Sequence, residues 1–191
     1  MSRPALVLAS ASPRRRELLQ SAGVDFVPEA ALAAEIHDPA LGMAGLVISN
    51  ARTKALEVAT RYPGAVVMGA DTLVWLDGHA LGKPSSPDDA RRMLRALAGR
   101  VHEVVTGVHL VRLDPRQQVE FHEVTRVRFR ALDDKMIEDY LSMVDVMDKA
   151  GAYALQERGE MIVEAVEGSR SNVVGLPVER VVAALEHHFG W

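Results

Sequence analysis

The sequence contains no cysteine among its 191 residues. This absence excludes disulfides, thiolate metal ligands and a cysteine nucleophile, and it is typical of a reducing compartment. Aromatic residues are also few, at 5% of the chain, which leaves few rings for stacking on nucleic-acid bases. No apolar run approaches the ~18–20 residues that cross a bilayer. We therefore expect a soluble, cytoplasmic protein with no membrane segment.

The charge and composition are those of a globular protein without a nucleic-acid partner. Hydrophobic residues make up 48% of the chain and charged residues 25%, with a net charge of −4 and a pI near 6.0. Proteins that bind nucleic acid usually carry a basic face, so we expect no such partner. The first apolar run, residues 5–9, is shorter than the ~7–15 residues of a secretion signal, which again favours the cytoplasm.

Strands and helices alternate along the chain, with hairpins between some of them. Ser12-Pro13 is a typical helix start and Gly23 a typical helix end, while Asp77-Gly78 predicts a type I′ turn between two strands. We expect an α/β fold on a mixed sheet, in one domain that covers residues 1–191. The expected strands cover residues 6–8, 65–70, 72–76, 79–82, 102–113, 119–129 and 161–166, and the expected helices cover residues 13–22, 43–62, 87–98, 133–143 and 177–188.

The turn at residues 10–17, Ser-Ala-Ser-Pro-Arg-Arg-Arg-Glu, places three arginines in the first turn of a helix. Cations at a helix N-terminus oppose the helix dipole by ~0.3–1 kcal/mol each, so a bound anion is a natural explanation. Arginine also offers paired N–H groups to phosphate oxygens. A solvated basic turn, neutralised by Glu17, is the alternative.

An acid, Asp71, follows the apolar strand predicted at residues 65–70. A carboxylate at the end of a strand in an α/β sheet lies where ligands bind. Such a carboxylate can take a proton from water or hold a divalent cation, while Lys83 can neutralise phosphate charge. The alternative for Asp71 is a turn residue before a hairpin, and Glu35 and Lys54 taken alone are typical of a solvated surface.

Two further segments, residues 148–156 and 168–177, mix small and polar residues. They suit a loop that lets a ligand approach the backbone, and equally a tight structural turn. The signatures of P-loop proteins, dinucleotide-binding proteins, zinc proteases and esterases are all missing. His187 and His188 are typical of the polar end of a last amphipathic helix rather than of a metal site.

Taken in order, these segments resemble the signatures of the Maf family of nucleotide pyrophosphatases. The resemblance covers almost the whole chain and rests on residues 10–19, 69–72, 82–84, 148–156 and 172–177. It implies a mixed, elongated sheet flanked by helices, with two lobes around a nucleotide cleft, as in inosine triphosphate pyrophosphatases. It also implies a homodimer and a divalent metal, Mg²⁺ or Mn²⁺.

The resemblance assigns roles to particular residues. It makes Asp71 the proton acceptor that activates water, and it makes Glu35, together with Asp71, a ligand of the metal. The neighbourhood of Glu35 departs from the acidic pair that is usual in the family. The groups that the resemblance places on the triphosphate or the base are Lys54, Lys83, Ser10, Ser12, Arg14, Arg15, Thr72 and Gln156.

Within the family, Arg14, Thr72 and Gln156 resemble the pyrimidine branch. This resemblance implies hydrolysis of dTTP and UTP at the α–β phosphoanhydride bond, with action on modified pyrimidine nucleotides and a link to cell-division arrest as further expectations. The glutamine amide can both donate and accept, so it matches the imide edge of uracil and thymine. Two alternatives are a 7-methyl-GTP pyrophosphatase and a nucleotide-binding regulator of septum formation without turnover.

Overall fold

The computed structural model describes residues 4–191 and confirms the alternation of strands and helices. The positive φ angles of Asp77 (51°) and Gly78 (83°) confirm the predicted tight turn, and Gly23, at 69°, ends the first helix. The elements in chain order are β1 Leu6–Leu8, α1 Pro13–Ser21, β2 Val27–Pro28, the 3₁₀ helix η1 Pro39–Leu41, α2 Gly42–Ala59, β3 Val66–Leu76, β4 His79–Leu81, α3 Pro87–Leu97, β5 Val101–Leu113, β6 Arg116–Phe129, α4 Asp134–Met143, the 3₁₀ helix η2 Ala150–Ala152, α5 Gly159–Ile162, β7 Val163–Glu167, α6 Arg170–Val174 and α7 Val178–Phe189.

The described strands form one seven-stranded sheet in the order β2-β1-β3-β5-β6-β7, with β4 paired to β3. Strand β1 runs parallel to both β2 and β3, whereas β4 is antiparallel to β3 and β7 is antiparallel to β6. The sheet is therefore mixed, and helices flank it, which confirms the predicted fold class. No helix within residues 4–191 is both long and apolar enough to cross a membrane.

The strand predicted near residues 161–166 is confirmed as β7, although it begins at Val163, because Met161 lies in the single turn of α5. The place of Asp71 was predicted wrongly. Asp71 was expected at the end of a strand, but it lies inside β3, which continues without a break from Val66 to Leu76. The strand continues because residues 72–76 stay extended as far as the turn at Asp77-Gly78.

The chain divides into two compact units. Unit 1 comprises the described residues up to Thr72 together with Thr106–Glu123 and Gly175–Trp191, and unit 2 comprises Leu73–Val105 and Val124–Val174. The prediction of a single domain and a nucleotide cleft stays a prediction.

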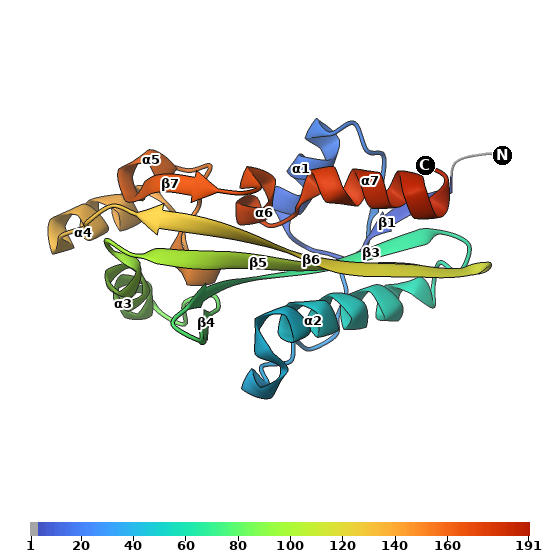
Figure 1. Ribbon diagram of the computed structural model, residues 1–191, viewed down its shortest axis with the longest axis horizontal. Helices are drawn as coiled ribbons and strands as arrows, with labels where there is room; N and C mark the ends of the chain where they lie inside the picture. The colour runs from blue at the N-terminus through green and yellow to red at the C-terminus, as the bar shows by residue number, and fades with distance from the viewer. Residues whose placement is uncertain (1–3) are drawn as a thin grey trace. The chain divides into compact units, whose positions relative to one another are not determined.

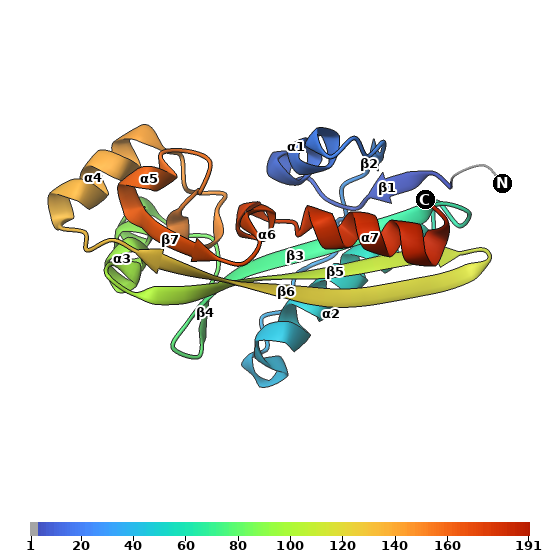
Figure 2. The same cartoon turned by 45° about the horizontal axis from the view of Figure 1, so that its top comes forward.

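In unit 1, helices cover both faces of the strands. Helix α2 lies on one side, and α7 lies on the other together with α1 (Figures 1 and 2). The alternation of side chains in β1 and β3 decides which residues face which helix. Leu6, Leu8, Val66, Met68 and Ala70 share a buried cluster with residues of α1 and α7, and Val7, Ala9 and Val67 share another with Ala55, Val58 and Ala59 of α2.

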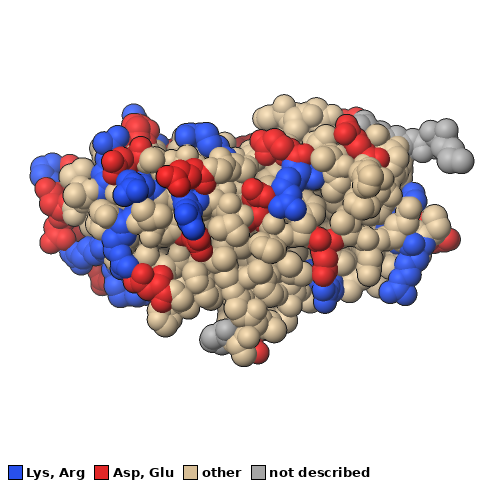
Figure 3. Space-filling view, viewed as in Figure 1, with Lys and Arg blue, Asp and Glu red and all other residues tan. Residues whose placement is uncertain are grey.

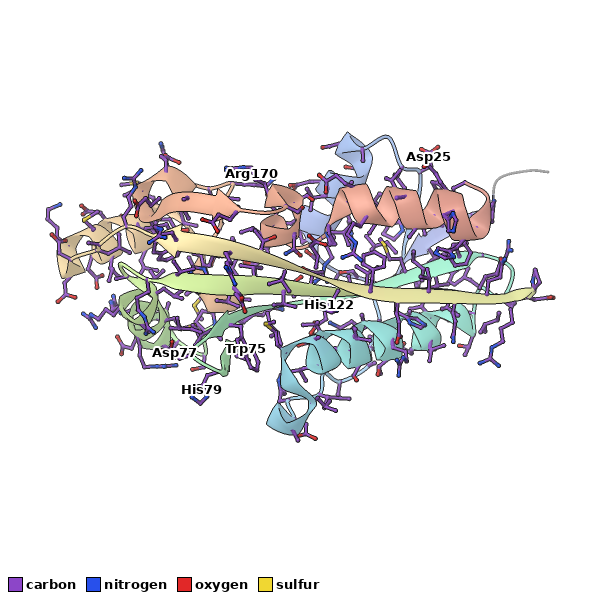
Figure 4. All side chains as sticks on the ribbon, viewed as in Figure 1. Asp25, Trp75, Asp77, His79, His122 and Arg170 are labelled. Atoms are coloured by element: carbon purple, nitrogen blue, oxygen red, sulfur yellow. The ribbon has the colours of Figure 1, made fainter. Side chains whose placement is uncertain are left out.

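In unit 2, apolar residues of α3 and α4 pack on the strands, and an aromatic group closes the core. The rings of His102, Phe129 and Tyr153 meet edge to face, with centroids 4.9–5.4 Å apart. Burial lowers the pKa of His102 to about 4, so its ring is neutral at pH 7 and shares a 2.9 Å hydrogen bond with the Tyr153 hydroxyl. Figure 4 shows Asp77 and His79 of the same unit at the β3–β4 hairpin.

Candidate active site

Asp71 is the most deeply buried carboxylate among the predicted site residues, with 4% of its surface exposed. Each of its oxygens accepts a hydrogen bond from a residue of α2. The Lys54 ammonium donates to Oδ1 at 2.7 Å, and the Asn50 amide donates to Oδ2 at 3.0 Å. Because Asn50 and Lys54 are four residues apart, they share one face of the helix.

Lys54 also joins Asp71 to Glu35. Its Nζ donates to Glu35 Oε1 at 2.7 Å, the same distance as to Asp71, so the two carboxylates converge on one ammonium group. The Lys54 side chain is 13% exposed and that of Glu35 is 42% exposed. Three residues that the sequence placed in the site thus meet, and Glu35 is the most exposed of them.

Two glycines allow α2 to come this close to the strands. A Cβ at Gly69 of β3 would lie 2.1 Å from the backbone oxygen of Ala51, and a Cβ at Gly107 of β5 would lie 2.5 Å from the backbone of Val47. Such distances are far inside van der Waals contact, so only glycine fits at either position. Asp71, two residues after Gly69, points from the same face of β3 toward α2.

Arg15 is the member of the arginine turn that faces inward. It is 9% exposed, and it donates from Nε to the Gly175 carbonyl (2.8 Å), from Nη1 to Ser10 Oγ (3.2 Å) and from Nη2 to Thr72 Oγ1 (3.0 Å). Burial lowers the pKa of Arg15, and the nearby negative charge of Asp71 partly opposes that effect. Three of its five N–H groups thus donate to other residues within the described range 4–191.

Ser10, Ser12 and Arg14 complete the turn. Ser10 is buried, and its Oγ also accepts the backbone N–H of Ser12 at 3.2 Å. Ser12 precedes α1 as predicted, although its side chain makes no capping hydrogen bond to the helix. Both Ser12 and Arg14 are half-buried. The prediction that these residues bind phosphate stays a prediction.

Lys83 and Gln156 belong to unit 2, and both are exposed. The segments that carry them lie side by side, because the backbone N–H of Gly151 donates to the Gly82 carbonyl at 3.0 Å. The structure therefore brings together two of the motifs that the sequence singled out. It describes Lys83 and Gln156 within unit 2 and Asp71 within unit 1.

Two buried side chains of unit 2 fix the chain on either side of Gln156. The Tyr140 hydroxyl accepts the N–H of Ala154 at 2.9 Å and donates to its carbonyl at 3.4 Å, and burial raises the pKa of Tyr140 to about 12. The Lys149 ammonium lies 3.4 Å from a carboxylate oxygen of Glu157. The side chain of Gln156 is thus exposed, while buried side chains contact the residues on both sides of it.

Asn50 was not predicted as a site residue from the sequence. It is 2% exposed, it contacts Asp71, and it also binds the backbone of Ile36. A lone asparagine inside an amphipathic helix gives no signal of its own. The available signal was its spacing of four residues from Lys54, which puts both on one helix face.

Comparisons with known proteins agree over nearly the whole chain. A family model described as Maf-like protein matches residues 5–188. A protein of Akkermansia muciniphila named dTTP/UTP pyrophosphatase is 45% identical over 182 residues, which is 95% of this chain and 95% of that protein. A protein of the same name from Symbiobacterium thermophilum is 46% identical, over 97% of this chain and 94% of that protein. Another, from Pyrococcus furiosus, is 40% identical, over 95% of this chain and 94% of that protein.

Proposed function

The chain belongs to the Maf-like protein family, and from that premise we propose that it hydrolyses dTTP and UTP between the α and β phosphates. The products are the nucleoside monophosphate and pyrophosphate. The family predicted from the sequence signatures is confirmed by the match over residues 5–188. The substrate is supported by the shared name of relatives that are 40–46% identical over most of this chain.

One observation carries the proposal for the chemical step, and it is the way Asp71 is held. A buried carboxylate with a fixed direction, next to an ammonium group, is the arrangement that a general base requires. Each carboxylate oxygen has two lone pairs, so Asp71 can accept a proton from water while its contacts to Asn50 and Lys54 persist. Water activated in this way attacks the α phosphorus.

Cationic groups would bind the triphosphate around Asp71. Lys54 is partly exposed and can reach a phosphate oxygen, and Arg15 keeps two N–H groups that its contacts with the described residues do not use. In unit 2, Lys83 is exposed and offers a further positive charge. In phosphoryl transfer, positioning and charge of this kind supply most of the acceleration.

The residues also fit a divalent metal. No group of three or more histidine, aspartate or glutamate side chains within residues 4–191 could hold an ion. Glu35 and Asp71 do converge on a single cation, the Lys54 ammonium. Mg²⁺ typically takes one or two carboxylates and completes its shell with waters and substrate phosphates. Glu35 and Asp71 would therefore hold Mg²⁺ or Mn²⁺, which when bound neutralises charge on the departing pyrophosphate.

The proposal extends to the setting of the enzyme. It includes a homodimer, a cytoplasmic location, action on modified pyrimidine nucleotides and a link to cell-division arrest. It includes no nucleic-acid partner, which the net charge of −4 favours. Over the face shown in Figure 3, acidic side chains lie among the basic ones.

With Mg²⁺ or Mn²⁺, we expect the purified protein to convert dTTP to dTMP and pyrophosphate in equal amounts. Anion-exchange chromatography of the nucleotides, with an enzymatic pyrophosphate assay, measures both products. The formation of dTDP and orthophosphate would refute cleavage between the α and β phosphates. An absence of any product would favour the alternative of a regulator without turnover.

Gln156→Glu is expected to lower kcat/KM for dTTP and UTP by roughly 5- to 150-fold, the cost of one polar group that is mispaired once the bound base covers it. The glutamine amide can donate to O4 and accept from N3–H of the pyrimidine, whereas an ionised carboxylate sets an acceptor against O4. A 7-methylguanine nucleotide should lose less or gain, because its positive ring and N1–H suit a carboxylate. Steady-state kinetics with the three substrates measure the ratio.

Glu157→Gln is the matched control for this change. It exchanges the same two groups one position along the chain, where the side chain faces Lys149. The control should leave the ratio of kcat/KM values among the three substrates unchanged. If Gln156→Glu lowers kcat/KM equally for all three, Gln156 supports the fold or the phosphates and does not recognise the base.

A further inference from the structure

Side chains on one face of helix α2 make hydrogen bonds to the segment of residues 32–36. Glu57 accepts the backbone N–H groups of Leu32 and Ala33 at 2.8 and 2.7 Å. Lys54 binds the Glu35 side chain, and Asn50 binds the backbone of the next residue, Ile36. The contacts run in opposite order along the helix and the segment, so the segment lies antiparallel to α2.

Among these three side chains of α2, Asn50 has an amide whose orientation is fixed by its hydrogen-bond partners. Its Oδ1 accepts the N–H of Ile36 at 2.7 Å, and its Nδ2 donates to the Ile36 carbonyl at 3.2 Å and to Asp71 Oδ2 at 3.0 Å. A primary amide has two N–H donors, and both are used here. Since Ile36 presents one donor and one acceptor and the Asp71 carboxylate only accepts, the amide cannot be reversed without losing all three hydrogen bonds.

The fixed amide in turn fixes the direction of the Asp71 carboxylate. With Oδ2 held by Asn50, the other oxygen, Oδ1, is directed at Lys54, which also contacts Glu35. The same amide holds Ile36, the residue after Glu35. Asn50 therefore sets the positions of both carboxylates, one by a direct contact and one through the backbone.

We propose that Asn50 is a positioning residue that orients Asp71 and couples it to the segment that carries Glu35. This inference rests on the proposed function, because it concerns the same catalytic step. Asn50 acts through Asp71, and its 2% exposure leaves it no surface with which to bind the substrate. Its contribution therefore belongs to kcat rather than to substrate affinity.

Asn50→Ala is expected to lower kcat for dTTP by about 10- to 100-fold, which corresponds to the loss of one hydrogen bond to a charged group. The KM for dTTP should stay within about threefold of the wild-type value, because the phosphate-binding cations are untouched. Hydrogen–deuterium exchange should speed up at residues 32–36. A cooperative thermal unfolding transition shows that the variant is folded.

Glu57→Ala is the matched control, because it frees the same segment at Leu32 and Ala33 without touching Asp71. It should speed exchange at residues 32–36 and lower kcat less than Asn50→Ala does. A second comparison uses the Asp71→Asn background, where Asn50→Ala should lower the residual kcat by less than about twofold, since residues that act as one unit are not additive.

Several outcomes would overturn the positioning role. One is a loss of kcat in Asn50→Ala that equals the loss in Glu57→Ala. Another is that Asn50→Ala lowers kcat by the same factor in the wild-type and in the Asp71→Asn background. The third is an Asn50→Ala protein with the wild-type kcat. Failure of the proposed function is distinguishable from these outcomes. A wild-type protein that does not turn over dTTP removes the proposed function, whereas a wild-type enzyme whose kcat survives Asn50→Ala removes only the inference about Asn50.

Discussion

Asp71→Asn is expected to lower kcat for dTTP by at least ~10²-fold, the lower range for a positioned general acid or base. The amide keeps the shape of the side chain but cannot take a proton from water. The loss should appear in kcat and in kcat/KM together, since the residue acts in the transition state. Steady-state kinetics of the two purified proteins measure it.

The surroundings of Asp71 also predict a cost in stability. Both of its oxygens accept from donors, Asn50 and Lys54, and neither donor can become an acceptor at its present contact. An asparagine at this position sets its own NH₂ against one of them, at a cost of about 1–3 kcal/mol for a buried, unsatisfied group. Thermal unfolding must therefore accompany the kinetics.

Asp77→Asn provides a matched control for the chemical change. Asp77 lies at the end of the same strand, in the β3–β4 turn, where it is exposed and pairs with Arg100 (Figure 4). Its amide variant should keep kcat near the wild-type value. If a folded Asp71→Asn protein keeps more than about half of the wild-type kcat, Asp71 is a structural residue of β3 and another group activates the water.

Removal of divalent metal is expected to reduce dTTP hydrolysis to the background rate. Without the ion, the carboxylates of Glu35 and Asp71 share one ammonium group, that of Lys54, and the bound triphosphate adds further negative charge. An assay in excess EDTA, followed by addition of Mg²⁺ or Mn²⁺ in excess of the chelator, measures both the loss and its recovery. Activity that persists at full level in EDTA would remove the metal from the mechanism.

Glu35→Gln tests which residues hold the ion. The variant removes one of the two carboxylates but leaves an oxygen that can still accept from Lys54. It should raise the metal concentration that gives half-maximal activity, because Mg²⁺ is bound through charged oxygen ligands. An unchanged metal requirement would place the ion on other groups.

The sequence predicted the local features of the fold well because they depend on neighbouring residues. The strand before Ser10, the turn at Asp77-Gly78 and the end of α1 at Gly23 were all found in this way. The start of β7 was missed, since the single helical turn of α5 before it has no periodic pattern long enough to detect.

The contacts of the site were less predictable, because they join residues far apart in the chain. Nothing in the run Arg14-Arg15-Arg16 shows that Arg15 faces inward, since its partner Gly175 lies 160 residues away. In the same way, the role of Asn50 depends on where Ile36 and Asp71 come to lie. The sequence could nominate Asp71, Lys54 and Glu35, but it could not show that one ammonium group joins them.

The close backbone contact of α2 with β3 and β5 limits which substitutions this protein tolerates. Replacing glycine by alanine in regular structure is a common route to greater stability, because it reduces the freedom of the unfolded chain. Gly69 and Gly107 are exceptions, since an added methyl group would strike the backbone of α2. Variants designed for higher thermal stability should therefore keep both glycines, and substitutions should be made at solvent-exposed positions of the helices.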